Sequence, residues 1–462
     1  MLINYIKIAW RNLAKNKAYS AINIGGLALG MAVAILIGLW IWDELSYDKY
    51  HANYDRIVRV MQHQNFNGET GTQFSNPAVL AQEIRTKYPN DFKFVLQSSW
   101  NFQHTLAYGQ KKLLKSGSFI EPGVTEMLSL KMLKGTRDGL KDPYSIILSE
   151  SVAKAYFGNE DPMDKTLRLD NKVDVKVTGV YEDLPYNTSF RELTFIMPWD
   201  LFLIQNPWIQ KMDNPWGSNF TQTFAQLVPG ADVNKVSAKI RDVKLKASGP
   251  GEAKFKPVVF LQPMSKWHLY ADFKNGINVG GRIQYVWLFG IIGVFVLLLA
   301  CINFMNLSTA RSEKRAREVG VRKAIGSARS QLIAQFFSES FMVVILAFVL
   351  SIIMVLLILP AFNQLADKKL AVLWANPFFW LMGMFVCLFT GLVAGSYPAL
   401  YLSSFQPVKV LKGTFRVGRY ASLPRKVLVV LQFSVSVVLI IGTVVVYRQI
   451  QHAKNRPIGY QK

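Results

Sequence analysis

Five long apolar runs constrain this chain more than any other feature of its sequence. Each is long enough to cross a lipid bilayer as an α-helix, which takes about 20 residues. The runs cover residues 21–42, 285–307, 336–359, 378–400 and 427–447. With 51% hydrophobic residues, the 462-residue chain is more apolar than an ordinary soluble protein. We therefore predict a multi-pass α-helical membrane protein.

The segment between the first two runs, residues 43–283, is long and polar enough to form a separate domain. Alternating or β-branched stretches predict strands at residues 57–63, 92–97, 173–181, 223–228 and 258–262. Helical patterns occur at residues 76–88, 149–157 and 232–243. We expect Asn76 to cap the first helix, with Pro77 as its first residue, and Ser149 to cap the second. Interleaved strands and helices predict a large α+β domain.

No motif in the sequence carries enzymatic chemistry. The nucleophile elbow, the zinc-protease helix, the P-loop and the dinucleotide fingerprint are all absent from it. The five histidines are scattered without a second ligand three or four residues away, and both cysteines fall inside apolar runs. We therefore predict a non-catalytic chain without catalytic residues, a metal site or a bound cofactor of its own.

The net charge of +23 is distributed unevenly. Residues 43–283 hold 30 Lys/Arg and 26 Asp/Glu, so most of the excess flanks the apolar runs. This distribution favours contact with anionic membrane lipids and argues against nucleic-acid binding. Short basic loops stay on the cytoplasmic side, and the N-terminus and segments 308–330 and 401–426 are basic. We predict a cytoplasmic N-terminus, an extracytoplasmic polar domain and an outer tail at residues 448–462.

Further features concern how the helices pack at the membrane. Residues 1–20 carry apolar side chains on one face and basic ones on the other, which predicts an amphipathic helix in the cytoplasmic interface. Small residues let helix backbones approach closely. We assign this packing role to Gly26, Gly30, Gly391 and Gly395. Glu339 lies about one turn inside the third run, where we expect it to snorkel or to pair with a basic loop residue rather than relay protons.

The sequence resembles the MacB/FtsX-like permease family of ABC transporters in four patches. These are IKIAWRNLAKNKAYSAINIGGLALGMA, ILSESVAKAYFGNEDPMDKTL with VTGVYEDLPYNT, REVGVRKAIGSAR, and GSYPALYLSSFQPVKVLKG. The resemblance extends over the whole chain. It implies a MacB-like periplasmic core in which a porter-like part, around residues 54–100 and 220–265, receives an inserted subdomain.

The resemblance also implies a permease subunit in the bacterial inner membrane that is driven by a separate ATPase, which binds the ATP. The helix of the second run would continue through residues 311–317 into a coupling segment seated on that ATPase. The coupling residues would be Arg317, Glu318, Val319, Gly320, Val321, Arg322, Lys323, Ile325 and Gly326. Gly320 and Gly326 would reverse the chain at either end, and Val321 and Ile325 would form the docking face.

Several functions are compatible with this family. The chain would export a periplasmic drug or peptide or release lipoproteins; alternatively, it would regulate cell-wall hydrolases or act as a receptor or scaffold without an ATPase. A homo- or heterodimer of permeases and a periplasmic adaptor are further expected partners. Because larger relatives repeat the four-span plan, the fifth run leads us to expect the N-terminal half of a double-length permease.

Overall fold

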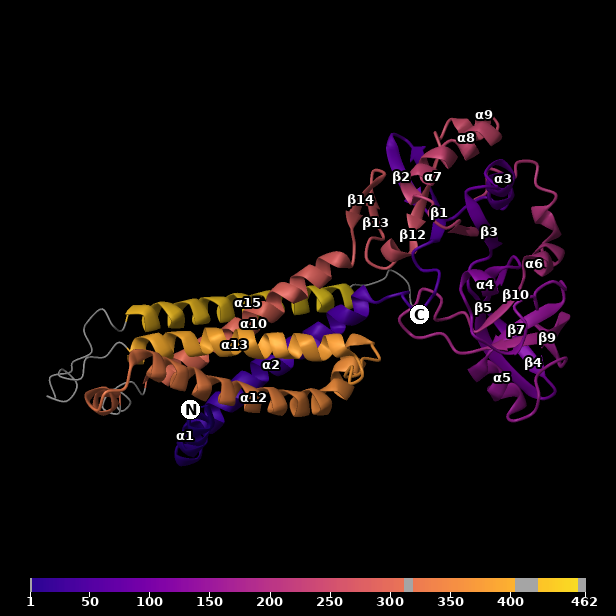
Figure 1. Cartoon of the computed structure of the whole chain (residues 1–462). Helices are drawn as coiled ribbons and strands as arrows, with labels where there is room; N and C mark the ends of the chain where they lie inside the picture. Colours follow the sequence, from indigo (N-terminus) through magenta and orange to yellow (C-terminus); the bar gives the residue numbers. More distant parts are fainter. Residues whose placement is uncertain (1, 311–318, 404–422, 456–462) are drawn as a thin grey trace. The chain divides into compact units, whose positions relative to one another are not determined.

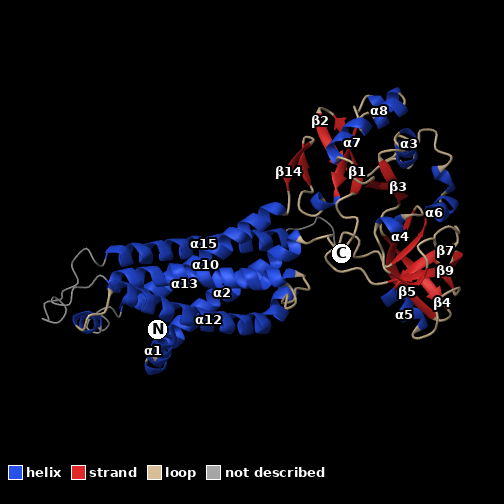
Figure 2. Ribbon diagram, in the orientation of Figure 1, coloured by secondary structure: helices blue, strands red, loops and turns tan. Residues whose placement is uncertain are grey.

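The computed structural model describes residues 2–310, 319–403 and 423–455 (Figure 1). The chain divides into two compact units. One, Trp42–Val286, is the polar unit. The other combines Met1–Ile41 with Trp287–Lys462 and is the helical unit. Figure 2 shows that strands are confined to the polar unit.

Among the described residues, five helices are long and apolar enough to cross a membrane. They are α2 (Lys17–Leu45), α10 (Ile283–Ala310), α12 (Arg329–Ala366), α13 (Pro377–Ser403) and α15 (Leu423–Asn455). They extend beyond the apolar runs: the 38 residues of α12 make it about 57 Å long, compared with about 30 Å of hydrocarbon in a bilayer. The predicted outer tail therefore begins as helix, because residues 448–455 continue α15. Residues 456–462, and 404–422 of the predicted basic loop, lie outside the described part of the chain.

The N-terminal helix is shorter than predicted. α1 (Leu2–Lys15) ends before residue 20, and Lys17 already begins α2. Polar side chains at this break bind carbonyls of α1: the Ser20 hydroxyl donates to the Leu13 carbonyl at 3.0 Å, and the Asn16 amide donates to the Asn12 carbonyl at 3.1 Å. Backbone bonds continue on both sides of the break, since the Asn16 N–H donates to the Asn12 carbonyl at 3.3 Å and the Ser20 N–H donates to the Asn16 carbonyl at 3.0 Å.

Four of the long helices share one apolar core. Its buried members are Leu27 and Met31 of α2, Leu297 and Cys301 of α10, Val343 and Val344 of α12, and Ala394 of α13. In contrast, none of the described side chains in the apolar stretch of α15 is buried. The four-helix core is therefore the stable framework to which the candidate site is attached.

The polar unit contains an α/β part built on four antiparallel strands. Their order is β3 (Phe92–Ser98), β11 (Gln222–Leu227), β1 (Ile57–Phe66) and β12 (Val258–Pro263). Helices α3 (Leu80–Lys87), α7 (Val233–Ile240) and α8 (Val243–Ala247) pack against these strands through an apolar core. β2 (Glu69–Gln73) pairs with β1, and β13 (Asp272–Lys274) and β14 (Ile277–Gly280) form a separate hairpin. α9 (Pro250–Ala253) precedes β12.

A closed six-stranded barrel is inserted between β3 and β11. Its strands are β4 (Phe102–Tyr108), β5 (Lys111–Ile120), β7 (Ser145–Ser149), β8 (Thr166–Leu169), β9 (Val173–Tyr181) and β10 (Phe195–Pro198). The barrel closes because β10 pairs with both β7 and β5. A Cβ on Gly117 would lie 2.5 Å from the Phe195 ring, so closure requires glycine there. The predicted α+β fold, with a porter-like part and an inserted subdomain, is confirmed.

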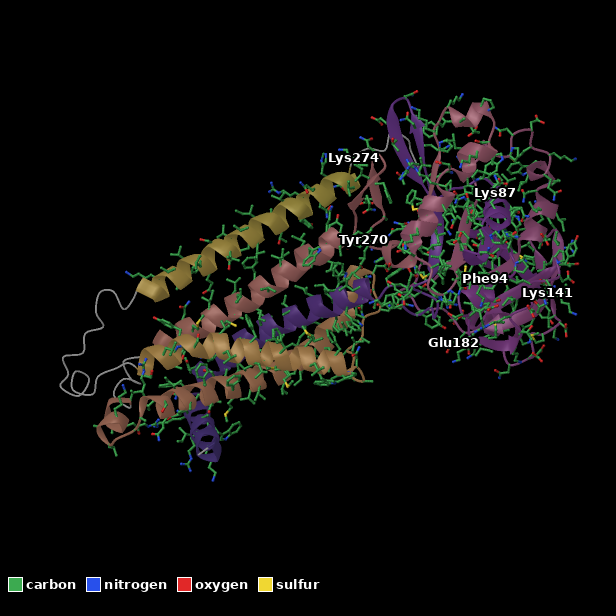
Figure 3. The ribbon with its side chains drawn as sticks, turned by 45° about the horizontal axis from the view of Figure 1, so that its top comes forward. Lys87, Phe94, Lys141, Glu182, Tyr270 and Lys274 are labelled. Atoms are coloured by element: carbon green, nitrogen blue, oxygen red, sulfur yellow. The ribbon has the colours of Figure 1, made fainter. Side chains whose placement is uncertain are left out.

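Short elements complete the polar unit. They are α4 (Val124–Met127), β6 (Met132–Gly135), α5 (Glu150–Phe157), α6 (Trp199–Gln205) and the 3-10 turns Pro207–Ile209 and Met264–Lys266. Figure 3 marks both parts: Lys87 and Phe94 belong to the α/β part, and Lys141 and Glu182 border barrel strands.

One predicted helix cap is wrong, and a second occupies the N-cap position without a capping hydrogen bond. Asn76 does not start a helix: it is buried, its backbone pairs with Thr221, its amide donates to the Val60 carbonyl at 2.8 Å, and α3 begins at Leu80. Long-range pairing of Asn76 therefore outweighs the local Asn-Pro signal. Ser149 does precede α5, but its side chain makes no capping bond. The carboxylate of Asp183 accepts the Ser151 N–H at 3.1 Å instead.

Lys244 predicts a pH dependence of stability that the sequence does not reveal. Its fully buried ammonium donates to the side-chain oxygens of Gln62 at 2.9 Å and Asn219 at 3.0 Å. Burial lowers the pKa of Lys244 to about 8. The unfolded chain, with a lysine pKa near 10.5, then binds more protons between pH 8 and pH 10.5, so Lys244 should make stability rise with pH across that window.

We compare the melting temperature of the wild-type chain with that of Lys244→Met at pH 7 and at pH 9.5. The difference, wild type minus variant, should be larger at pH 9.5. The measurement is the melting temperature of the full chain, followed by tryptophan fluorescence at both pH values. In the variant the Gln62 oxygen loses its lysine donor, whereas the Asn219 oxygen still accepts from the Gln62 amide at 2.9 Å. Neither amide titrates, so the free-energy cost of the lost bonds is the same at both pH values and cancels in the comparison. An identical pH dependence in the two proteins would contradict the expected titration of Lys244.

Candidate functional site

The candidate site is the described part of the basic connector between α10 and α12, residues 319–328, which we call the coupling segment. Arg317 and Glu318, also predicted to belong to it, lie outside the described residues, as does the predicted helical extension through 311–317. Residues 319–324 are helical, and α12 starts at Arg329. The segment is therefore a short helix joined to α12 by a tight turn.

Gly326 forms the turn after this helix. Its φ of +99° lies in the region that favours glycine. The Ser327 N–H donates to the Arg322 carbonyl and the Gly326 N–H to the Lys323 carbonyl, both at 3.0 Å. This is the Schellman pattern of a helix C-terminus. Gly320, which was predicted to reverse the chain at the other end, is instead buried within the helix.

The coupling segment is anchored to the ends of α12 and α13. Val319, 2% exposed, packs in a cluster with Leu332 and Phe336 of α12 and Ala399 of α13. The Lys323 ammonium donates to the carbonyl of Ser403, the last residue of α13, at 2.6 Å. A cation at this position also compensates the negative end of the helix dipole. Anchors on two helices make the segment suited to transmitting displacement into both.

Two apolar side chains of the segment face outward. Val321 is 44% exposed and Ile325 is 81% exposed. The helix therefore has two sides: Val319 is buried against α12 and α13, whereas Val321 and Ile325 form an exposed apolar surface that a partner protein could contact. These are the two residues assigned to docking from their spacing in the sequence.

A chain of hydrogen bonds links the coupling segment to α1. The Arg322 guanidinium donates to the side-chain oxygen of Gln335. The Gln335 amide donates to a carboxylate oxygen of Glu339 at 3.2 Å, and the Asn12 amide donates to the same oxygen at 3.0 Å. Glu339 thus joins α12 to the amphipathic N-terminal helix. We call these four residues, Arg322, Gln335, Glu339 and Asn12, the polar chain.

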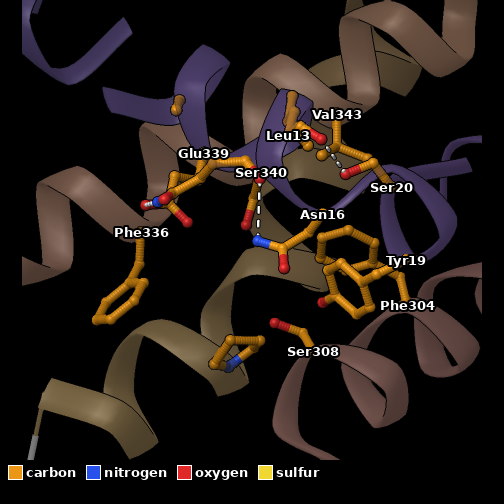
Figure 4. A pocket seen from close by; sticks show the side chains of 13 residues that line it. Leu13, Asn16, Tyr19, Ser20, Phe304, Ser308, Phe336, Glu339, Ser340 and Val343 are labelled. Carbon is orange, nitrogen blue, oxygen red and sulfur yellow. Dashed lines mark hydrogen bonds between the residues drawn. The ribbon is translucent and has the colours of Figure 1, made fainter. Parts of the chain in front are cut away.

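Figure 4 shows the surroundings of Glu339, where side chains of α1, α2, α10, α12 and α13 line a small cavity of about 30 Å³. A cavity of this size holds about one water molecule. The space is therefore a packing feature of the helix junction and too small for a substrate.

The four glycines assigned to helix packing lie at contacts between helices of the same chain. A Cβ on Gly30 would lie 2.5 Å from the Ala300 Cβ of α10, and one on Gly26 would lie 3.4 Å from the Asn303 amide. On α13, a Cβ on Gly391 would overlap the Phe341 ring of α12, and one on Gly395 would lie 3.0 Å from Ser340. These glycines thus set the separation of α2 from α10 and of α13 from α12.

Sequence reasoning missed an interaction at the last turn of α2. Glu44, 1% exposed, lies with one carboxylate oxygen 2.6 Å from Nε2 of His268, and the Tyr47 ring stacks on the His268 ring at 3.7 Å. The partners are 224 residues apart, so no local pattern could reveal them. Arg282, one residue before α10, lies 4.0 Å from the other oxygen of Glu44. The interaction ties together the chain ends that continue into α2 and α10.

Within the described ranges, no group of three or more histidine, cysteine, aspartate or glutamate side chains could hold a metal ion. Cys301 and Cys387 are free thiols in α10 and α13.

The fold and the site define a class of protein: a multi-pass membrane protein whose large α+β domain combines a porter-like part with an inserted barrel. Residues 20–243 match the family described as the MacB-like periplasmic core domain. Residues 290–407 match the FtsX-like permease C-terminal family, and they include the coupling segment. The chain belongs to the MacB/FtsX-like ABC permease family, and its polar unit is a MacB-like periplasmic domain.

Individual relatives are similar over different lengths. The macrolide export ATP-binding/permease protein MacB of Bdellovibrio bacteriovorus is 21% identical over 434 residues, which cover 89% of this chain and 62% of the relative. MacB of Campylobacter jejuni is 30% identical over 139 residues, 30% of this chain and 21% of the relative. The chain thus spans less than two thirds of these MacB proteins. The uncharacterized ABC transporter permease YvrN of Bacillus subtilis is 20% identical and is matched over its full length, against 89% of this chain.

Solved structures of two isolated domains are also similar. A domain of a putative permease from Porphyromonas gingivalis is 19% identical with a TM-score of 0.39, covering 52% of this chain and 98% of that domain. The periplasmic region of MacB from Actinobacillus actinomycetemcomitans is 16% identical with a TM-score of 0.35. The match covers 46% of this chain and 92% of that region.

Proposed function

We propose that this chain is the permease subunit of a mechanically driven ABC transporter, and that a separate cytoplasmic ATPase docks on the coupling segment. The observation that carries the proposal is the two-sided character of that segment. Val321 and Ile325 present an exposed apolar surface. On the other side, Val319 and Lys323 hold the same helix to α12 and α13. A partner seated on the exposed surface would therefore move both helices.

The charges and hydrogen bonds support a route for this movement. The basic connector and the N-terminus lie on the cytoplasmic side in the proposed orientation, where the partner binds ATP. Displacement of the coupling segment would pull on Gln335 and Glu339 of α12 through Arg322, and on α1 through Asn12. The last turn of α2, held by the Glu44–His268 contact, would carry the movement into the periplasmic domain. No substrate needs to pass between the membrane helices.

The proposed activity is export of a drug or peptide captured in the periplasm, or release of lipoproteins from the membrane. The relatives include macrolide export proteins and the pyoverdine export ATP-binding/permease protein PvdT of Pseudomonas entomophila. We propose in addition that two permease chains act together and that a periplasmic adaptor receives the substrate.

The proposal is tested by changing both exposed apolar residues, Val321→Asp and Ile325→Asp, in the full chain. The wild-type chain is purified from its native host with the ABC ATPase that accompanies it, and ATP hydrolysis by the complex is measured. Buried carboxylates without partners are costly at a protein interface. We expect permease-dependent ATP turnover in the double variant to fall at least tenfold, to the background of the ATPase alone.

The matched control is Ile277→Asp, which places the same charge on an exposed isoleucine of the β13–β14 hairpin. It should retain wild-type turnover. Absence of an ABC ATPase from the wild-type preparation, or unchanged turnover in the double variant, would reject the proposed coupling and favour a receptor or scaffold that works without an ATPase.

A further inference from the structure

A pocket of about 430 Å³ lies in the periplasmic domain where the chain passes from the α/β part into the barrel. Its wall includes Arg59 of β1, Trp100 between β3 and β4, Ser118 of β5 and Phe224 of β11. The volume is within the range of small-molecule sites, about 300–1,000 Å³. Nothing in the proposed docking of an ATPase uses this pocket.

Arg59 is the chemically distinctive group in the pocket wall. Its Nε donates to the side-chain oxygen of Gln262 at 2.7 Å. Among the described residues it forms no ion pair with a carboxylate within 4.0 Å. Burial lowers its pKa to about 10, which still leaves the guanidinium charged at neutral pH. The negative charge of Asp48 also acts on Arg59, although the two form no ion pair. A partly buried cation without an ion pair gains more from a ligand anion than a solvated surface arginine does.

Aromatic side chains surround this guanidinium. Its central carbon lies 4.6 Å from the centre of the Phe74 ring and 5.6 Å from that of Trp267. Trp100 contacts Phe74, with the ring centres 5.2 Å apart. A second hollow of about 500 Å³ shares Arg59, Phe74 and Trp267 with the first pocket. Arg59 thus lines both hollows and is bordered by apolar ring surface, and the second hollow also contains Asp272.

The charges of the first pocket select against cationic ligands. No aspartate or glutamate belongs to the wall as far as the described residues define it, whereas Arg282 adds a second guanidinium, which lies 4.0 Å from a Glu44 carboxylate oxygen. Hydroxyl groups of Ser98, Ser99, Ser118 and Ser189 also line the wall, but those of Ser98, Ser99 and Ser189 already donate within the protein, to the Ser99 and Trp100 carbonyls and to the Asp48 carboxylate. A ligand that complements this pocket carries one anionic group to pair with the guanidinium and an apolar body to pack against the aromatic rings.

We propose that this pocket binds an amphipathic anion, whose carboxylate or similar acidic group pairs with Arg59 and whose ring or acyl body lies against Phe74, Trp100 and Trp267. Planar guanidinium groups bind such acids through two parallel hydrogen bonds, which gives orientation as well as affinity. Tyr47 and His268 also line the pocket, so a bound ligand would touch the residues that hold Glu44 at the end of α2.

The test uses the full chain in lipid nanodiscs and isothermal titration calorimetry, with empty nanodiscs subtracted. The probes are 1-naphthaleneacetate and decanoate, which share a carboxylate and differ in having a ring or an acyl chain. The uncharged 1-naphthaleneacetamide is the matched neutral ligand. We expect saturable binding of at least one anion, at least tenfold tighter than the amide, and whichever anion binds identifies the body that the pocket accepts.

Arg59→Gln should weaken binding of that anion at least tenfold, while Arg59→Lys keeps the charge and should lose less. Arg56→Gln is the control, because Arg56 lies three residues away, bonds to Asn53 and does not line the pocket. If Arg59→Gln does not fold, Trp100→Leu tests the ring surface and should weaken naphthaleneacetate binding severalfold.

Equal affinity for the anion and the amide, no saturable binding of either anion, or unchanged binding in Arg59→Gln would overturn the proposal. The experiment requires neither ATP nor a partner ATPase. A negative result would therefore leave the proposed coupling untouched, and a failed coupling experiment would not affect this one.

Discussion

Replacing Gly391 with alanine should markedly reduce the amount of folded chain recovered from membranes. A methyl group at this position of α13 would overlap the ring of Phe341 on α12, and both helices belong to the shared core of the helical unit. Forcing an extra carbon into a packed helix contact typically costs about 1–3 kcal/mol. The measurements are the monodisperse fraction after detergent extraction and the melting temperature of the purified chain.

Two further variants identify the cause. Combining Gly391→Ala with Phe341→Leu removes the ring that the new methyl group meets, and should recover part of the lost stability. Gly442→Ala is the matched control, because a Cβ on this glycine of α15 meets nothing within 4 Å. It should be neutral, since alanine favours helix more than glycine does. A Gly391→Ala chain as stable as the wild type would show that the helices are farther apart than described.

Gln335→Leu should uncouple the α1 helix from the coupling segment. The change keeps a side chain of similar size but removes both the acceptor for Arg322 and a donor to Glu339. Buried polar groups that lose a partner typically cost about 1–3 kcal/mol each. We expect the complex with the ATPase to form normally, because Val321 and Ile325 are unchanged, while permease-dependent ATP turnover falls severalfold.

A double-mutant cycle shows whether the polar chain acts as a unit. Asn12 and Gln335 donate to the same oxygen of Glu339, so Asn12→Ala and Gln335→Leu should change the melting temperature by less together than the sum of their separate effects. Ser338→Ala is the control on the same helix, since within the described part of the chain the Ser338 hydroxyl bonds to the Ala334 carbonyl one turn away and not to the polar chain. Its effect should simply add to that of Asn12→Ala. Full additivity for Asn12 and Gln335 would disprove their connection.

Much of the local structure could be predicted because it depends on neighbouring residues. The alternation in residues 173–181 predicts a strand with the bounds of β9. The helical pattern at residues 232–243 begins at Asp232, and its carboxylate accepts the N–H groups of Asn234 and Lys235 at the start of α7. The exposed positions of Val321 and Ile325 follow from a spacing of four on a short helix. Each of these features is decided within a few residues of the chain.

The failures also have a common cause. Asn76 carries a strong helix-start signal, yet pairing with Thr221 places it in the sheet region. Ser149 loses its capping role to the carboxylate of Asp183, and Gly320 lies inside a helix buried on the α12–α13 anchor. At each of these positions, a contact with residues far away in the sequence stabilises the structure more than the local conformational preference does.

The sequence by itself determined that this protein has long membrane-crossing helices, basic connectors and an α+β domain, because apolar length, charge and side-chain alternation act locally. Only the tertiary structure decided that β10 closes a barrel, that Lys323 reaches the end of α13, and that Arg59 stands among aromatic rings. These features join residues far apart in the chain. Their energies depend on the register and packing of whole elements, which no short stretch of sequence specifies.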